Sequence, residues 1–355
     1  MTVRWPLAVP SPSPLDLRFK GVPMKPSSAL LTPAVPPSSA HLVPRRNRFA
    51  RRLGWTAAFF AGISLLSACT EVRSEAADAQ AYPAPGQLVD VGGFRLHLDC
   101  RGTGSPTVVI DAGLGSWSTP WHMVQTAVAS ATRVCTYDRA GLGYSDPGPQ
   151  PRDAAHFANE LHTLLHRAGV AEPYVLAGHS LGGLTMRVYA HRYPQDVAGV
   201  VFIDSMSLQR GGASTTVGAS QAQGINLLSV AARLGLVRAL SGPLGFFEGL
   251  PAQDAGAYKA LSVTPRFFQT MADETAGIPG SLAQAGEVMT LGALPLTVLT
   301  RGLNQEPAWM TKQHGLLELS SSSTQVIALH SGHNIELDEP KAAVDAIVGM
   351  VQQVR

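Results

Sequence analysis

From residue 87 onward, short apolar runs alternate with longer amphipathic ones. The runs "TVVIDAG", "RVCTYDRAG", "YVLAG", "VAGVVFID", "LPLTVLTRG" and "QVIALH" have the length and β-branched content of buried strands. "DAAHFANELHTLLHRAG" and "LGGLTMRVYAHRY" instead place apolar residues at helical spacing. We expect Asp153 to cap the first of these helices and Gly169 to end it. Strands alternating with helices predict an α/β fold, a mostly parallel sheet with helices on both faces.

Two segments depart from this alternation. "QLVDVGGFRLHLDC" has two alternating runs around Gly92-Gly93, which predicts a hairpin at the start of the sheet. Residues 205–290 contain no clear strand pattern but include the apolar stretches "INLLSVAARLGLVRAL" and "RFFQTM". We therefore predict a core formed by residues 87–204 and 291–355, with a helical cap inserted at 205–290.

The N-terminal region has the pattern of an export signal. The basic run "RRNRFARR" precedes the uncharged stretch "LGWTAAFFAGISLLSAC", which ends at Cys69. This apolar stretch is shorter than the roughly 20 residues that a spanning helix needs, although an N-terminal membrane anchor is the alternative. We interpret 45–69 as a signal peptide, 70–86 as a linker, and the Pro- and Ser-rich residues 1–44 as a disordered or upstream-start extension.

The end of that apolar stretch, Leu66-Ser67-Ala68-Cys69, resembles the lipobox of bacterial lipoproteins. In that family the cysteine is lipidated and becomes the mature N-terminus. The resemblance implies lipidation of Cys69 and an exported protein held at a membrane by its lipid. Thr70, where inner-membrane members carry Asp, favours the outer membrane, on its periplasmic side or at the surface.

Composition narrows the class further. The chain of 355 residues is 45% hydrophobic and only 15% charged, which argues against a disordered chain. Its net charge is +2, and much of the basic excess lies in the run "RRNRFARR" rather than over a folded surface, so we expect no nucleic acid partner. Of the three cysteines, lipidation of Cys69 leaves Cys100 and Cys135, either as a disulfide or as two buried thiols.

The candidate chemistry centres on "VLAGHSLGGLTMRVYA". Ser180 stands in a Gly-x-Ser-x-Gly pattern between a predicted strand and a predicted helix, which is the context that a nucleophile elbow requires. Here the chain resembles the α/β-hydrolase family, in its esterase and lipase branch, over approximately residues 87–355. The resemblance implies a serine nucleophile and no cofactor or metal. Serine at this position argues against dehalogenase and epoxide hydrolase chemistry, for which this fold uses Asp.

The family order of Ser, acid and then His places the base late in the chain. The candidates are His314, His330 and His333. His333 lies in "SGHNIELDEP", which resembles the family's catalytic-histidine loop, so we assign it as the base. His314 falls inside a predicted helix, and we interpret His330 as a packed or surface residue. A metal site at His330-x-x-His333 would lack further ligands of suitable spacing.

Two carboxylates compete for the role of the acid. Most relatives carry it after the strand "LTVLT", where this chain offers only Glu306, at the start of a predicted helix. Some relatives place the acid one strand earlier, where "VVFIDS" ends with Asp204. We favour Asp204, whose alternative role is to cap the next turn. We expect Asp338 to cap the helix that begins at Pro340.

The resemblance also predicts an oxyanion hole. Its two backbone N–H donors would be Leu181, directly after the serine, and Leu114 in "AGLGSWS", where Ala112 replaces the family's usual His. The family loop "YDRAGLGYSD" suggests a structural pairing of Asp138 with Arg139.

Together these features predict a carboxylic ester hydrolase acting on a small-molecule ester with an apolar group. Lactone opening or carbon–carbon bond hydrolysis on the same triad are the alternatives. A lipid-anchored binding protein on an inactive hydrolase scaffold is the alternative outside enzymes.

Overall fold

The computed structural model describes residues 48–207, 217–241 and 250–355. The extension expected at 1–44 lies outside these residues, as do parts of the predicted cap.

The core is one eight-stranded sheet in the order β1-β2-β4-β3-β5-β6-β7-β8. β2 pairs antiparallel with both β1 and β4, and every later pairing is parallel. The prediction of a mostly parallel sheet that opens with a hairpin is confirmed. The strands are β1 Gln87–Asp90, β2 Arg95–Arg101, β3 Thr107–Asp111, β4 Val134–Tyr137, β5 Tyr174–His179, β6 Val197–Ile203, β7 Leu296–Arg301 and β8 Ser323–Ala328.

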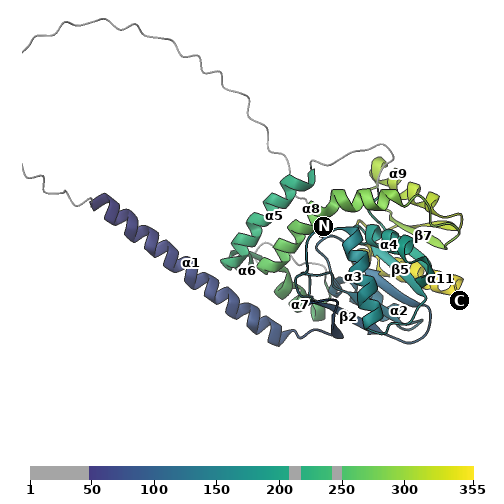
Figure 1. The fold of residues 1–355 in the computed structure, drawn as a ribbon, viewed down its shortest axis with the longest axis horizontal. Coiled ribbons are helices and arrows are strands. Elements are labelled where there is room, and N and C mark those ends of the chain that lie inside the picture. The colour runs from purple at the N-terminus through teal and green to yellow at the C-terminus, as the bar shows by residue number, and fades with distance from the viewer. Residues whose placement is uncertain (1–47, 208–216, 242–249) are drawn as a thin grey trace, which may run out of the picture. The chain divides into compact units, whose positions relative to one another are not determined.

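Helices cover both faces of the sheet (Figure 1). α3 (Ala154–Arg167) and α4 (Leu181–Arg192) pack with one set of buried side chains. α2 (His122–Val128) and α11 (Pro340–Gln353) pack with the other set. Asp153 caps α3 by accepting a hydrogen bond from the His156 amide, as the sequence predicts. The remaining core helices are α9 (Pro307–Leu316), α10 (Ile335–Asp338), η1 (Thr119–Trp121), η2 (Pro194–Asp196) and η3 (Leu317–Leu319).

Between β6 and β7 the described residues are helical. They form α5 (Val217–Arg233), α6 (Leu236–Ser241), α7 (Ala252–Ser262) and α8 (Pro265–Glu287). α8 contacts α5, α4 and α3, so it joins this inserted segment to one helical layer of the core. Two residues fix where α8 begins. The Thr264 side chain caps the helix by accepting a hydrogen bond from the Phe267 amide, and Pro265 occupies the first turn.

The N-terminal helix α1 spans Arg48–Ala81, so it includes residues 70–81 of the segment 70–86 that was predicted as a linker. The reason is local, because residues 71–81 contain Ala, Glu and Gln but no Gly or Pro. Within the described residues Trp55–Ala81 is long and apolar enough to cross a membrane, a test that an N-terminal signal sequence also passes. Cys69 is exposed and unbonded on this helix.

Cys100 and Cys135 form a disulfide between β2 and β4. The antiparallel register places them directly opposite each other, with Cα atoms 4.0 Å apart.

Candidate active site

Ser180 lies in the turn from β5 into α4, with φ 51° and ψ −115°. A non-glycine residue in this region is strained, and the surrounding packing has to hold it there. The two glycines of the pattern permit that packing. A Cβ on Gly182 would lie 2.4 Å from the Asp111 carbonyl oxygen, and one on Gly178 would lie 2.6 Å from that of Gly182. The tight turn leaves the serine hydroxyl at the carboxyl edge of the sheet.

His333 contacts both Ser180 and Asp204. The Ser180 hydroxyl lies 3.0 Å from His333 Nε2, and His333 Nδ1 lies 2.5 Å from Asp204 Oδ2. Nδ1–H donates to the carboxylate, which leaves Nε2 as the acceptor for the serine proton. The structure therefore brings together the serine, histidine and aspartate that the sequence analysis selected.

Asp204 is fixed from several sides. It follows β6 with φ 39°, is fully buried, and accepts hydrogen bonds at Oδ1 from Trp309 Nε1 at 2.8 Å and the Arg301 amide at 3.3 Å. Burial acts to raise the pKa of Asp204, but the hydrogen bonds from His333 and Trp309 hold that pKa below its ordinary value. The carboxylate is therefore ionised at neutral pH. Glu306, the competing candidate, is exposed at the start of α9.

The other candidates fall outside this triad. His314 lies in the last turn of α9, and His330 is exposed, with its amide donating to Glu339. The expectation that Asp338 caps the last helix is wrong. Asp338 instead accepts the Gly332 amide and so closes the His333 loop, because its side chain points back toward that loop; Glu339 occupies the cap position.

Of the two predicted oxyanion donors, Leu114 lines the cavity that Ser180 also lines, and Leu181 directly follows Ser180 in the chain. Leu181 is the first residue of α4, so its amide has no partner inside the helix. Leu114 lies in the loop after β3, and its neighbours Gly113 and Gly115 line the cavity with it.

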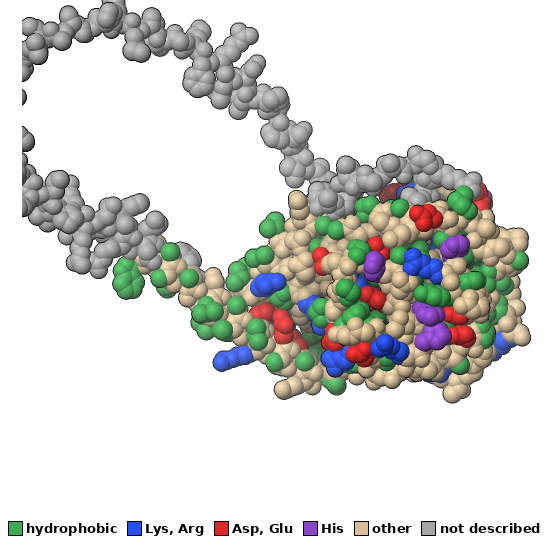
Figure 2. All heavy atoms as spheres, viewed as in Figure 1, with side chains coloured by type: hydrophobic (Ala, Val, Ile, Leu, Met, Phe, Trp, Pro, Cys, Tyr) green, Lys and Arg blue, Asp and Glu red, His purple; other side chains and the backbone are tan. Residues whose placement is uncertain are grey.

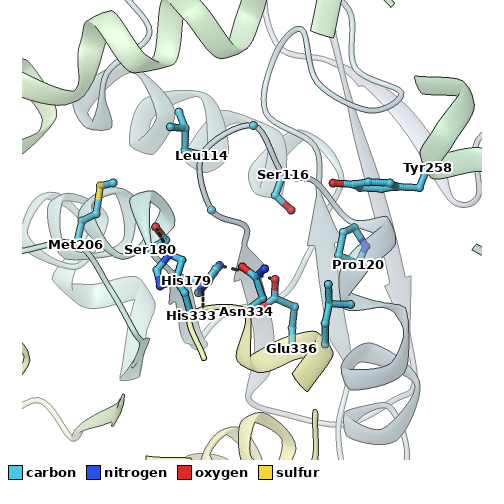
Figure 3. A pocket seen from close by; sticks show the side chains of 13 residues that line it. Leu114, Ser116, Pro120, His179, Ser180, Met206, Tyr258, His333, Asn334 and Glu336 are labelled. Atoms are coloured by element: carbon cyan, nitrogen blue, oxygen red, sulfur yellow. Dashed lines mark hydrogen bonds and ion pairs between the residues drawn. The ribbon is translucent and has the colours of Figure 1, made fainter. Parts of the chain in front are cut away.

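The cavity has a volume of about 360 Å³, and both Ser180 and His333 line it (Figure 3). Its apolar lining includes Leu114, Met206 and Leu337, and Tyr258 of the inserted helix α7 also lines it. Ser116, Asn334 and Glu336 add polar groups. The arrangement places the Ser180 hydroxyl and the His333 imidazole side by side in one open cavity.

A family model described as the alpha/beta hydrolase fold matches residues 106–246. Two solved structures are similar to this chain: an esterase from Thermogutta terrifontis (18% identity, TM-score 0.61) and the epoxide hydrolase CorEH (17% identity, TM-score 0.59). Each match covers 76% of this chain and 99% of the solved chain. This chain has the α/β-hydrolase fold. At these identities the likeness to solved structures shows the fold alone.

Two curated relatives of this α/β-hydrolase-fold chain match over part of their own length. "Probable transporter efuK" of Hormonema carpetanum is 37% identical over 126 residues, which cover 33% of this chain and 18% of that protein. An uncharacterized Schizosaccharomyces pombe protein is 28% identical over 304 residues, covering 73% of this chain and 54% of that protein. The chain thus spans about half or less of these two relatives.

In this α/β-hydrolase fold, a buried ion network holds the loop that carries Leu114. Arg139 lies 2.7 Å from Asp111 and 2.7 Å from Glu274 of α8, and it donates to the Gly113 carbonyl at 2.7 Å. Glu274 also accepts the Gly115 amide at 3.1 Å. Because Glu274 accepts a hydrogen bond from the Gly115 amide and Arg139 donates one to the Gly113 carbonyl, the backbone is held on both sides of Leu114.

The expected pairing of Asp138 with Arg139 is wrong. Adjacent residues leaving a strand point to opposite faces of the sheet, so each finds a different partner. Asp138 lies 2.9 Å from Nδ1 of the buried His97, and Arg139 reaches Asp111 and Glu274.

Replacing Arg139 by methionine should lower the free energy of unfolding by about 3–5 kcal/mol, since it leaves buried carboxylates without their cation. Urea denaturation of the two proteins measures the difference. Arg95→Met is the matched control, because the Arg95–Asp146 pair is solvent-exposed and should contribute no more than about 1 kcal/mol. Equal losses in the two variants would show that the Arg139 network does not stabilise the fold.

His179 and Glu336 form a second buried pair beside the triad. His179 Nε2 donates to the His333 carbonyl at 2.9 Å, so Nδ1, 3.9 Å from Glu336 Oε1, carries no proton. Burial lowers the pKa of His179 to about 3 and raises the pKa of Glu336 to about 8. Both groups are therefore neutral at pH 7. His179 thus braces the His333 loop without adding charge to the cavity.

Ionisation of Glu336 should weaken the fold and slow turnover. Its folded pKa lies above the ordinary 4.5, so the folded state binds the extra proton, and stability falls as pH rises from about 4.5 to 8. A negative charge in the cavity also opposes oxyanion formation, so kcat/KM should fall above about pH 8. Glu336→Gln should remove this alkaline decline and gain stability on the order of a few kcal/mol at pH 9. Kinetic and urea profiles from pH 6 to 10 test both effects.

The matched control is Glu287→Gln, because Glu287 is an exposed glutamate of α8. It should leave both profiles unchanged. An alkaline decline that persists in Glu336→Gln would contradict the assignment to Glu336.

Several site residues escaped the sequence analysis. Trp309 and Glu274 carry no motif, and their roles arise from contacts across 105 and 135 residues of chain with Asp204 and Arg139. His179 lies inside the elbow motif itself, which was the one local signal available.

Proposed function

We propose that this protein is a serine hydrolase that cleaves a carboxylic ester through an acyl-enzyme. The observation that carries the proposal is His333, which lies between Ser180 Oγ at 3.0 Å and the ionised Asp204 at 2.5 Å. A serine hydroxyl is a weak nucleophile until a base takes its proton, and this geometry supplies that base with its orienting carboxylate.

In the first half of the reaction Ser180 Oγ attacks the ester carbonyl while His333 Nε2 takes the hydroxyl proton. Asp204 stabilises the imidazolium through Nδ1. The Leu114 and Leu181 amides donate to the oxyanion of the tetrahedral intermediate. His333 then protonates the alkoxide as the C–O bond breaks, and the alcohol leaves.

In the second half a water molecule attacks the acyl-enzyme. His333 takes a proton from that water and returns it to Ser180 Oγ as the acid departs. Atoms and charges balance without a cofactor, since the net reaction is ester plus water to acid plus alcohol.

The cavity supports a small substrate with an apolar group. Its volume of about 360 Å³ is at the lower end of the range of ligand pockets, and Leu114, Met206 and Leu337 offer apolar contact. We therefore expect short acyl esters to be better substrates than long-chain ones. Lactone opening and carbon–carbon bond hydrolysis would use the same triad and are separate arms of the test.

The test combines labelling with a substrate panel. A fluorophosphonate should add its phosphonyl mass to the peptide containing Ser180. p-Nitrophenyl esters from acetate to palmitate, a lactone and a vinylogous diketone then separate the three reactions. Failure to label, with no turnover of any substrate, would favour the non-catalytic binding protein.

We also propose that Cys69 is lipidated and that the chain is anchored in the cell envelope. The exposed Cys69 at the end of an apolar run, preceded by a basic segment, supports this proposal. Several acyl chains on one cysteine would hold the hydrolase firmly at a membrane, whereas a single chain binds weakly.

A further inference from the structure

Two histidines and an aspartate lie together far from the proposed triad. His162 and His166 stand four residues apart in α3, so they share one face of that helix. Asp196 ends η2, immediately before β6. Each of the three offers one ligand atom, and these atoms lie within 4.8 Å of one another. Figure 2 shows histidine and acidic side chains side by side on the face of the core that α3 and α4 cover.

The distances fit a metal site that needs only small side-chain rotations. His162 Nε2 is already 3.6 Å from Asp196 Oδ2. Zinc holds nitrogen and oxygen ligands at about 2.0–2.2 Å, which places tetrahedral ligands about 3.4 Å apart. Glu172 Oε1 lies 3.5 Å from His166 Nε2 and offers a fourth ligand at the open side.

The surrounding side chains hold the ligands in place. The Tyr193 ring stacks on His162, with centroids 3.8 Å apart and planes 13° apart. The Tyr189 hydroxyl lies 3.5 Å from Asp196 Oδ2, and Asp196 is 3% exposed. Fixed ligand orientations of this kind raise the affinity of a metal site. His166 is exposed, so a metal ion has a path from solvent.

The cluster cannot take part in the chemistry at Ser180. Asp196 precedes β6 and Asp204 follows it, so the whole strand Val197–Ile203 separates them. At about 3.3 Å per residue this is on the order of 25 Å. A metal there would instead tie the end of α3 to the segment that feeds β6.

We propose that His162, His166 and Asp196 form a binding site for a divalent transition metal of the zinc type. Two imidazoles and one carboxylate suit zinc and its neighbours, whereas magnesium and calcium prefer oxygen ligands alone. The sequence analysis expected no metal, and the only local signal of this cluster is the spacing of His162 and His166 in α3. Asp196 joins the two histidines only through the packing of α3 against the α4–β6 connection.

Calorimetric titration of the untagged protein with zinc tests the site. We expect one zinc ion per chain and a rise in melting temperature on saturation. His166→Ala should weaken zinc binding by about tenfold or more and abolish that rise. Cobalt(II) bound to the wild type should give the visible absorption of a nitrogen- and oxygen-ligated ion, and His166→Ala should lose it.

Two further variants make the result decisive. His191→Ala removes an exposed histidine of α4 that is not one of the three ligands, and zinc affinity should not change. His166→Asp restores a ligand and should recover zinc binding. Absence of saturable zinc binding, or unchanged affinity in His166→Ala, would overturn the proposal.

Discussion

Alanine at position 180 should lower kcat/KM for an ester by about a millionfold, the loss expected when a triad serine is removed. The substitution removes only the hydroxyl oxygen. Alanine keeps the Cβ, so the strain of the φ 51° turn and the packing of Gly178 and Gly182 stay as they are. Absorbance assays of p-nitrophenol release from p-nitrophenyl esters measure the rate, and the melting temperature of the variant verifies that it is folded.

Ser116→Ala is the matched control for this experiment. Ser116 lines the same cavity from the loop after β3, whereas the described hydrogen bonds of the His333 ring go to Ser180 and Asp204. We expect that variant to stay within about tenfold of the wild type, since removing one neutral hydrogen bond costs about 1 kcal/mol. Substantial turnover in a pure, folded Ser180→Ala protein would refute the proposed mechanism.

Asparagine at position 204 should reduce kcat by about ten-thousandfold, because it forces the wrong tautomer on the base. Trp309 Nε1 and the Arg301 amide both donate to Oδ1, so the asparagine must keep its oxygen at that position. Its NH₂ group then faces His333 Nδ1, which has to become the acceptor. The ring proton then lies on Nε2, and a protonated Nε2 can no longer accept the proton of the Ser180 hydroxyl.

The control is Glu306→Gln, which neutralises the competing carboxylate. Glu306 is exposed at the start of α9, and its loss should leave kcat unchanged. If Glu306→Gln were the inactive variant and Asp204→Asn retained activity, Glu306 would be the acid instead. Asp204 is buried and Asn has nearly the same volume, so we expect Asp204→Asn to stay folded. Melting curves of the variant test this expectation.

The predictions for Ser180 and Asp204 test the proposed reaction, which the fold by itself does not specify. An esterase and an epoxide hydrolase have closely similar TM-scores against this chain, 0.61 and 0.59, so the fold does not choose between their reactions. The choice lies in the residues at the carboxyl edge of the sheet. Ser180 with His333 is the arrangement of acyl transfer, which is why the proposals above rest on these side chains.

Local pattern alone predicted most of the core. Strand and helix periodicities are set within a few residues, so the parallel sheet, the Asp153 cap and the elbow before α4 could be read from short segments. The family order of the triad narrowed the base to three histidines. The same local reasoning failed at Asp338, where the adjacent Glu339 takes the cap position and Asp338 accepts the Gly332 amide instead.

What the sequence determined by itself was the α/β-hydrolase fold, the strand-to-helix turn that carries Ser180 and the late loop that carries His333, because each depends on residues that are neighbours along the chain. The tertiary structure decided which carboxylate meets His333, how Arg139 and Glu274 hold the oxyanion loop, and that Glu336 is buried beside His179. It also brought Asp196 to His162 and His166. These contacts join residues far apart in the sequence, and only the packed sheet and helices fix the distances between them.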